Sequence, residues 1–230
     1  MENKPGFAEA NTWILYSDQD LLVVNKPAGL LSIPDGYHPE FPHLAQALTP
    51  LVGKLWIVHR LDKETSGVML LARSAEAHRV LNQAFRERAL HKLYHCLSAP
   101  SPAWDAQDVD LPLRINADRA HRTRVDMENG KPARTLVSVL RRGESYALLA
   151  CEPATGYTHQ IRAHLYHLGL WILGDALYRP KTVNLTDSRL SANRLMLHAF
   201  EISFAHPTTG AELCFQAPYP PDFAEKLNSL

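Results

Sequence analysis

One acidic residue has the surroundings of a group placed for covalent chemistry. Asp62 lies in the run His-Arg-Leu-Asp-Lys-Glu-Thr-Ser-Gly at residues 59–67, between two short apolar runs. Arg60 precedes it by two residues, and a Thr-Ser-Gly turn follows it. A carboxylate between strand-like segments and close to a guanidinium is typical of a positioned reactive group rather than of a surface acid. We therefore predict that Asp62 carries the chemistry of this protein.

A second polar run covers residues 155–165, with the sequence Thr-Gly-Tyr-Thr-His-Gln-Ile-Arg-Ala-His-Leu. Its spacing predicts a helix with Thr158 as N-cap, and Gly169 is expected to end it. One face is an apolar stripe formed by Ile161, Leu165 and Leu168. The opposite face is predicted to present a polar stripe of His159, Arg162 and Tyr166. Burial of a helix does not require such a stripe, so it indicates a function.

Metal binding is the competing interpretation for the histidines of this run, His159, His164 and His167. Residues five apart in a helix lie roughly 140° apart around its axis, so His159 and His164 do not share a face. Only His164 and His167 do, and no carboxylate or thiolate is placed to complete a site. The three cysteines are far apart and form no C-x-x-C pair. The sequence therefore argues against a metal site.

The composition is that of a globular protein, with 230 residues of which 46% are hydrophobic and 21% charged. The N-terminus has no apolar segment and no run of about 18 apolar residues occurs, so we expect neither a signal peptide nor a membrane span. Widely spaced cysteines favour a reducing compartment, and we expect a cytoplasmic protein. The 24 basic and 24 acidic side chains balance, which argues against unspecific coating of nucleic acid.

The segment of residues 114–134 is nevertheless locally basic. It carries six basic and three acidic side chains, a net charge of +3. The basic residues are Arg114, Arg119, Arg122, Arg124, Lys131 and Arg134. Two interpretations fit equally well: contact with a phosphate backbone, or an exposed hairpin of mixed charge.

Hydrophobic periodicity predicts the elements that position these runs. Strands are expected at residues 13–16, 21–24, 55–58, 68–72, 92–98, 133–140, 145–152, 196–204 and 211–215. Helices are expected at residues 44–51, 74–90 with Ser74 as N-cap, and from Pro221 onward. Residues 25–36 and 100–132 are expected to be loops. We predict an α+β fold with a mixed, mainly antiparallel central sheet, as one domain of residues 13–230 after a tail of residues 1–12.

Together, the runs at residues 59–67 and 155–164 resemble the motifs of the RluA-type pseudouridine synthases. Further matches follow in the same order: residues 25–29, 92–94, 131–135, 174–175 with Tyr178, and 197–199. The resemblance spans about residues 13–220 and is greatest to short members without an N-terminal RNA-binding domain. Two departures are Tyr157, where the family usually has arginine, and Ala163, where valine is common.

The resemblance implies an isomerase that converts a uridine of structured RNA, a stem-loop of ribosomal or transfer RNA, to pseudouridine without metal or organic cofactor. It implies Asp62 as the nucleophile, kept ionised by Arg162. Tyr94 would stack on the uracil, Arg60 would hold or replace the flipped nucleotide, and Ile161 would support them. The residues expected to bind RNA are Arg114, Arg119, Arg122, Arg124, Lys131 and His159. We expect a monomer.

Two other functions remain open at this point. A relative that binds RNA without turnover would use the same pocket, although the presence of Asp62, Tyr94 and Arg162 together argues against it. A glycosidic-bond hydrolase would need a second catalytic acid across the bond. Glu64 is the nearest acid, but at two positions from Asp62 its side chain can point elsewhere.

Overall fold

A computed structural model describes residues 7–182 and 187–230, and the chain divides into two compact units. The first unit consists of Met1–Lys92 and Ala199–Pro220, and the second of Leu93–His198 and Pro221–Leu230. Both units combine helices with antiparallel strands, which confirms the predicted α+β class with mainly antiparallel pairing.

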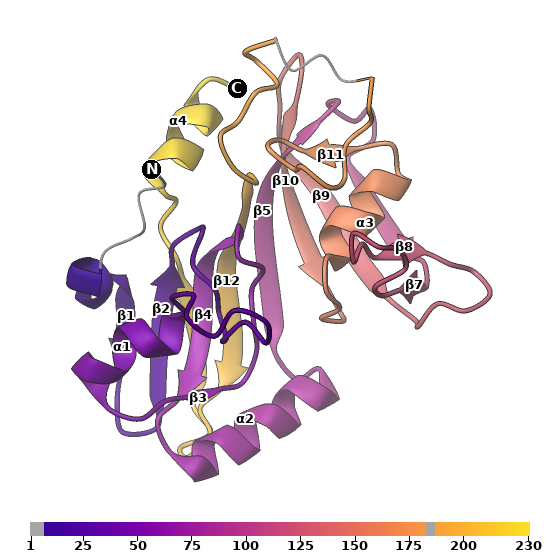
Figure 1. Cartoon of the computed structure of the whole chain (residues 1–230). Helices are drawn as coiled ribbons and strands as arrows, with labels where there is room; N and C mark the ends of the chain where they lie inside the picture. The colour runs from indigo at the N-terminus through magenta and orange to yellow at the C-terminus, as the bar shows by residue number, and fades with distance from the viewer. Residues whose placement is uncertain (1–6, 183–186) are drawn as a thin grey trace. The chain divides into compact units, whose positions relative to one another are not determined.

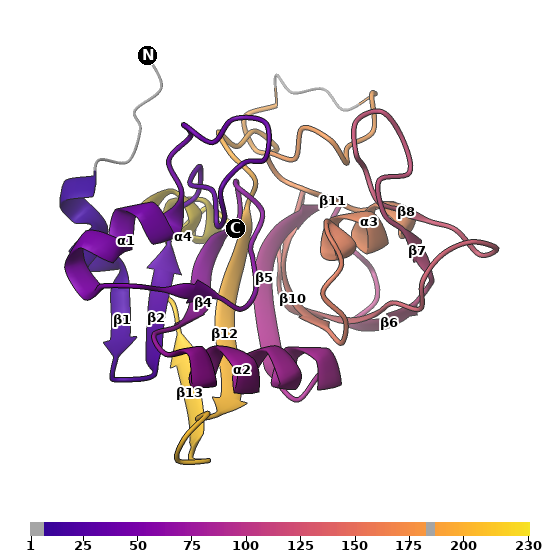
Figure 2. The same cartoon turned by 60° about the horizontal axis from the view of Figure 1, so that its bottom comes forward.

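The first unit is built on strands in the order β1-β2-β4-β12, with β3 beside β4 and β13 beside β12. Figure 2 shows β1, β2, β4 and β12 side by side, with β13 next to β12. The strands are β1 (Ile14–Ser17), β2 (Leu21–Lys26), β3 (Trp56–Ile57), β4 (Ser66–Ala72), β12 (Leu197–Ala205) and β13 (Glu212–Gln216). Its helices are the 3-10 helix η1 (Phe7–Trp13), α1 (Leu44–Val52) and α2 (Ala75–Glu87).

The core of this unit follows from uninterrupted apolar runs. Every residue of β4 is buried, and so are five of the six residues of β2. Strands buried on both faces read as continuous apolar runs instead of alternating ones. The helix α2 covers β4 and β3, and the Ser74 hydroxyl accepts a hydrogen bond from the Ala77 N–H at 3.1 Å, which confirms the predicted N-cap. In α1 the expected apolar face is correct for Leu44 and Leu48, but Leu51 is half exposed at 51%.

The second unit is built on strands in the order β5-β10-β9-β6, with β11 beside β5 and a separate β7–β8 pair. They are β5 (His91–Ala99), β6 (Ala106–Asp110), β7 (Leu113–Arg114), β8 (Arg124–Val125), β9 (Arg134–Arg142), β10 (Ala147–Pro153) and β11 (Trp171–Ile172). Helix α3 (Gln160–His167) packs against β8, β10 and β11, beside which it lies in Figure 1. Helix α4 (Pro221–Asn228) is hydrogen-bonded to the residue that precedes β10. The Tyr146 hydroxyl donates to the Lys226 carbonyl at 2.9 Å.

The segment of residues 100–132, expected to be a loop, contains three strands, so that prediction was wrong. Strand β6 pairs with β9 over five residues, from Ala106 opposite Ser138 to Asp110 opposite Arg134. In β6 only Val109 is buried, so the strand shows almost no apolar alternation. Its main-chain pairing with β9 stabilises it, and sequence periodicity does not report such pairing.

Helix α3 also begins differently from the prediction. His159, and not Thr158, occupies the N-cap position, in a left-handed conformation with φ of 58° and without a side-chain capping bond. The Thr158 carbonyl instead accepts a hydrogen bond from the Thr123 hydroxyl at 2.7 Å. The expected polar stripe is likewise wrong at its centre, because the first six residues of the helix, Arg162 among them, are all buried. Gly169 ends the helix as expected, with φ of +79°.

Candidate active site

The backbone on both sides of Asp62 is held by the loop that follows β2. On one side, the Leu61 N–H donates to the Ser32 hydroxyl at 3.0 Å, and that hydroxyl donates to the Leu61 carbonyl at 2.7 Å. On the other side, the Lys63 carbonyl accepts from the Gly29 N–H at 2.8 Å. Asp62 itself is partly buried. Its neighbours are therefore fixed to one loop, which restricts the directions that its carboxylate can take.

Lys26 supplies the centre of this arrangement. Its side chain is fully buried, and the ammonium donates to the carbonyls of Pro27, Leu30 and Lys63 at 2.8, 2.8 and 3.1 Å. A buried ammonium is tolerated only where hydrogen-bond acceptors replace its water. The three carbonyls do so, and they join the start of the loop, its turn and the residue after Asp62.

His59 anchors the beginning of the same run. Its Nε2 atom accepts a hydrogen bond from the Leu70 N–H of β4 at 2.9 Å, and its ring stacks on Phe85 of α2 with centroids 4.7 Å apart. Loss of hydration, together with the positive charge of Lys92, lowers the pKa of His59 to about 3. The ring is therefore neutral near pH 7, with its proton on Nδ1, as its role of acceptor at Nε2 requires.

Gly67 closes the run against β12. Its φ of +117° lies in the region that glycine favours, and a Cβ there would be 2.2 Å from the Ala199 carbonyl oxygen. A side chain of any size would force β4 and β12 apart. The Asp62 carbonyl accepts from the Thr65 N–H at 3.1 Å, which forms the turn between Asp62 and β4.

In the second unit, Arg162 forms a buried ion pair with Asp175. The Nε atom donates to Oδ2 at 2.7 Å and Nη2 donates to Oδ1 at 2.8 Å, a fork that matches the planar guanidinium. The side chains are 8% and 0% exposed. Asp175 also accepts from the N–H groups of Leu177 and Tyr178 at 2.9 and 3.0 Å. The pair with Asp175 was missed from the sequence, although Asp175 was noted among the family matches.

A chain of hydrogen bonds fixes the other face of α3. The Thr155 hydroxyl donates to Gln160 Oε1 at 2.6 Å, and Gln160 Nε2 donates to the Thr135 hydroxyl at 3.0 Å. That hydroxyl faces His164 Nδ1 at 2.9 Å, while His164 Nε2 faces the Leu111 carbonyl at 3.0 Å. A carbonyl only accepts, so the proton lies on Nε2 and Nδ1 accepts from Thr135. Burial lowers the pKa of His164, in agreement with this neutral form.

Tyr178 connects His159 to the segment before β8. The Thr123 N–H donates to the Tyr178 hydroxyl at 2.6 Å, and this hydroxyl lies 3.2 Å from His159 Nδ1. The Arg162 guanidinium lies over the Tyr178 ring, 4.9 Å from its centre. Burial raises the pKa of Tyr178 to about 12, so the phenol stays protonated near pH 7 where it contacts His159.

The other residues predicted for the site fall into separate groups. Tyr94 lies in β5, opposite Cys151 of β10, and Ile161 is buried in α3. Arg122 and Arg124 converge on Asp118, at 2.7 and 2.6 Å. Arg114 lies opposite Arg124 in the β7–β8 pair, is exposed and pairs with Asp126 at 3.5 Å. Arg119 and Lys131 are also exposed, and so is Arg60 in the first unit. Whether Arg162 also holds Asp62 ionised stays a prediction.

Two general properties concern residues 7–182 and 187–230 as a whole. Among these residues no group of three or more histidines, cysteines and carboxylates is arranged to hold a metal ion. None of the helices described there has the length and apolar character needed to cross a membrane.

Comparison with known proteins gives consistent similarities. Residues 20–167 match the family model described as RNA pseudouridylate synthase. The chain is 37% identical over 221 residues to the dual-specificity RNA pseudouridine synthase RluA of Escherichia coli strain K12, which covers 95% of this chain and 98% of that protein. The RluA protein of Pasteurella multocida is 38% identical over 207 residues, 89% of this chain and 92% of that protein.

Solved structures show the same likeness. Human RNA pseudouridylate synthase domain containing 4 is similar with a TM-score of 0.78 and 28% identity, over 96% of this chain and 95% of that one. Human RNA pseudouridylate synthase domain containing 1 gives a TM-score of 0.77 and 27% identity, over 93% and 86% of the two chains.

Proposed function

Because the chain belongs to the RNA pseudouridylate synthase family, and is therefore an isomerase of uridine in RNA, we propose that Asp62 is its catalytic carboxylate. The observation that carries the proposal is the fixation of the backbone on both sides of Asp62 by Ser32 and Lys26. A nucleophile must keep its direction while the substrate rearranges, and a loop held on both sides provides this.

The reaction needs little beyond a placed carboxylate. Asp62 acts on the ribose or the base, the N1–C1′ bond breaks, the uracil turns, and C5 bonds to C1′. C5 then loses its proton and N1 carries one, so substrate and product have the same composition. No oxidant or reductant is consumed, which is why we propose that the enzyme works without cofactor.

Four further residues have proposed roles. Arg162 keeps Asp62 ionised. Its fork to Asp175 is compatible with binding Asp62 as a second carboxylate, because a guanidinium has donors on three nitrogens. Tyr94 stacks on the uracil, Ile161 supports it from α3, and the exposed Arg60 holds or replaces the flipped nucleotide. The phenol of Tyr94 serves to position the base, because an ordinary tyrosine is protonated at pH 7.

Exchange of the carboxylate tests the mechanism. With RNA labelled with tritium at C5 of uridine, we expect the wild-type protein to release tritium and Asp62→Asn to release none while binding RNA with nearly unchanged affinity. Glu64→Gln is the matched control, since it removes an exposed acid two residues away and should keep full release. Release by Asp62→Asn would contradict the proposal. Release of free uracil by the wild-type protein would indicate a hydrolase. RNA binding by the wild-type protein without release of tritium would indicate a relative that binds RNA without turnover.

The substrate is proposed to be a stem-loop of ribosomal or transfer RNA. The E. coli relative carries the name of a dual-specificity enzyme, which supports more than one RNA for this chain. We expect residues 13–230 to act as one catalytic domain, as a monomer and in the cytoplasm. Mapping pseudouridines in total RNA from cells with and without the gene identifies the target, and sites lost from ribosomal or transfer RNA support the proposal. Loss confined to other RNAs would contradict it.

A further inference from the structure

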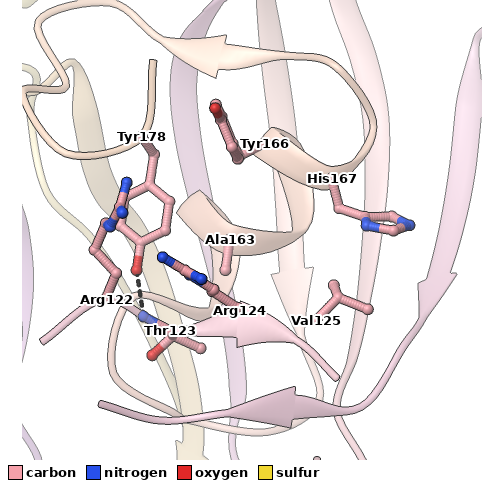
Figure 3. A pocket seen from close by; sticks show the side chains of 8 residues that line it. All are labelled: Arg122, Thr123, Arg124, Val125, Ala163, Tyr166, His167 and Tyr178. Atoms are coloured by element: carbon pink, nitrogen blue, oxygen red, sulfur yellow. Dashed lines mark hydrogen bonds between the residues drawn. The ribbon is translucent and has the colours of Figure 1, made fainter. Parts of the chain in front are cut away.

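A pocket of about 510 Å³ lies in the second unit, between β8 and α3. Figure 3 shows the residues that line it, which are Arg122, Thr123, Arg124, Val125, Ala163, Tyr166, His167 and Tyr178. Neither Asp62 nor Tyr94 is among them. The volume is within the range of about 300–1,000 Å³ that small-molecule sites occupy.

The inner wall of the pocket is apolar and closely packed. Ala163 of α3 and Tyr178 pack in one buried cluster with Leu113 and Ala133, and Val125 lies against it. The Tyr178 ring is held at its hydroxyl by the Thr123 N–H, as the dashed line in Figure 3 marks. A small residue at Ala163 leaves space beside β8 that a larger side chain would occupy. The pocket therefore exists before a ligand binds, which lowers the entropic cost of binding.

The opening of the pocket is positively charged. Arg122 and Arg124 share a single carboxylate, Asp118, and their side chains are 35% and 53% exposed. Burial alone would raise the pKa of Asp118, but hydrogen bonds from Arg122, Arg124 and Ala120 outweigh it and lower this pKa to about 2. Asp118 is thus ionised near pH 7, and two arginines against one carboxylate leave a net charge of +1. Asp118 also orients both guanidiniums before a ligand arrives.

An exposed aromatic ring lies at the same opening. Tyr166 of α3 is 43% exposed, and its ring meets the edge of Tyr178 with centroids 6.2 Å apart. His167 follows it on the surface. An aromatic ring next to paired arginines is the combination with which proteins bind single nucleotides, by stacking on the base and forked contacts to the phosphate.

We propose that this pocket binds one nucleotide of the substrate RNA other than the target uridine. Its base stacks on Tyr166, and its phosphate is held by Arg122 and Arg124. The nucleotide is a second one because Asp62, which is to act on the target, does not line the pocket. A base that stacks on Tyr166 has left its own stack in the RNA, so the pocket selects substrates by a nucleotide besides the target. The proposal rests on RNA being the substrate.

A combined change of protein and RNA tests the base contact. Take an RNA hairpin in which the wild-type protein forms pseudouridine, replace its loop nucleotides one at a time by abasic residues, and measure dissociation constants by fluorescence anisotropy. One position besides the target should lose affinity by roughly 5- to 150-fold, as expected for a lost stack. Tyr166→Ala should cause the same loss with intact RNA and none in addition with that abasic RNA. Tyr166→Phe, which keeps the ring, should bind as the wild type does.

The phosphate contact has its own test and control. Arg124→Ala should lower the slope of log affinity against log salt by about 1. Arg79→Ala is the matched control, because Arg79 makes an exposed ion pair with Glu76 at 2.6 Å, the distance of the Arg124–Asp118 pair. It should change neither slope nor affinity. Thermal unfolding of each variant verifies that it folds.

Two outcomes would overturn the proposal. The first is that the affinity loss of Tyr166→Ala adds to the loss at every abasic position. The second is that no position besides the target loses affinity when it is made abasic. Either result would show that no base enters the pocket. If Arg124→Ala lowers the salt slope but Tyr166→Ala is not coupled to any abasic position, the surface binds only phosphates and not a base. Tritium release by the wild-type protein with the same hairpin separates these failures from a failure of the catalytic proposal.

Discussion

Lys26 and Ser32 show how single side chains prepare Asp62 for chemistry. The Ser32 hydroxyl both donates to and accepts from the main chain of Leu61, and Lys26 binds the carbonyl of Lys63. Both are positioning residues, since they act through the backbone. Ser32 had no predicted role, and Lys26 was noted only as part of a family match. The signal for Lys26 was a lysine at the end of a continuous apolar strand, which is buried on both faces.

His59 gives a prediction for the pH dependence of stability. Its pKa is about 3 in the folded protein and 6.5 when unperturbed, so below pH 6.5 only the unfolded chain gains the proton. The stabilisation is complete above pH 6.5 and decreases as the pH falls toward 3, by at most about 1.4 kcal/mol per pH unit. Urea unfolding between pH 6.5 and 5 measures it. His59→Gln, which retains an acceptor for Leu70 but cannot titrate, should show a shallower decrease, and equal slopes would contradict this.

At the scale of elements, the loop after β2 and the run from His59 to Gly67 form one structure. Lys26 at the end of β2, and Gly29 and Ser32 in the loop, bind this run, which lies about thirty residues later in the chain. The loop therefore lacks regular structure because its hydrogen-bonding groups are used between segments. Its proline and glycine signals predicted the irregularity correctly but not the partner.

Gly67 provides a prediction at this scale. In Gly67→Ala the new Cβ would meet the Ala199 carbonyl at 2.2 Å in a backbone conformation with φ of +117°. We expect a loss of about 3 kcal/mol or more in unfolding free energy and a marked loss of activity, since β4 and β12 must separate. Gly36→Ala is the control, because a Cβ there has no heavy atom within 4 Å. Urea unfolding and tritium release measure both, and equal behaviour of the two variants would show that the close approach is unimportant.

For the whole molecule, a net charge of zero coexists with RNA as substrate. Attraction to RNA must therefore come from local surplus charge, such as the pair Arg122 and Arg124 against Asp118. The residues predicted to bind RNA have different polar partners in the structure, and their contact with RNA stays a prediction. Arg122 and Arg124 share a carboxylate and a pocket, and His159 is bound to Tyr178. Arg114 pairs with another acid, Asp126.

Independence from metal ions is the prediction for the complete enzyme. The proposed rearrangement uses a carboxylate and consumes no reagent, so EDTA should leave the rate of tritium release unchanged. The assay is run in monovalent salt, with an RNA hairpin that folds without divalent ions. A rate that falls with EDTA and returns with one added metal would contradict the prediction.

The sequence by itself determined most of the elements of regular periodicity and identified the candidate nucleophile. The apolar periodicity and the capping residues that mark an element lie within a few positions of one another, so α2 and the strands β1, β2, β9 and β10 were predicted correctly. Only tertiary structure decided which distant groups meet. Examples are the fork of Arg162 to Asp175, the neutral His164 and the pairing of β6 with β9. Each depends on contacts between residues distant in the sequence, which the pattern of neighbouring residues does not specify.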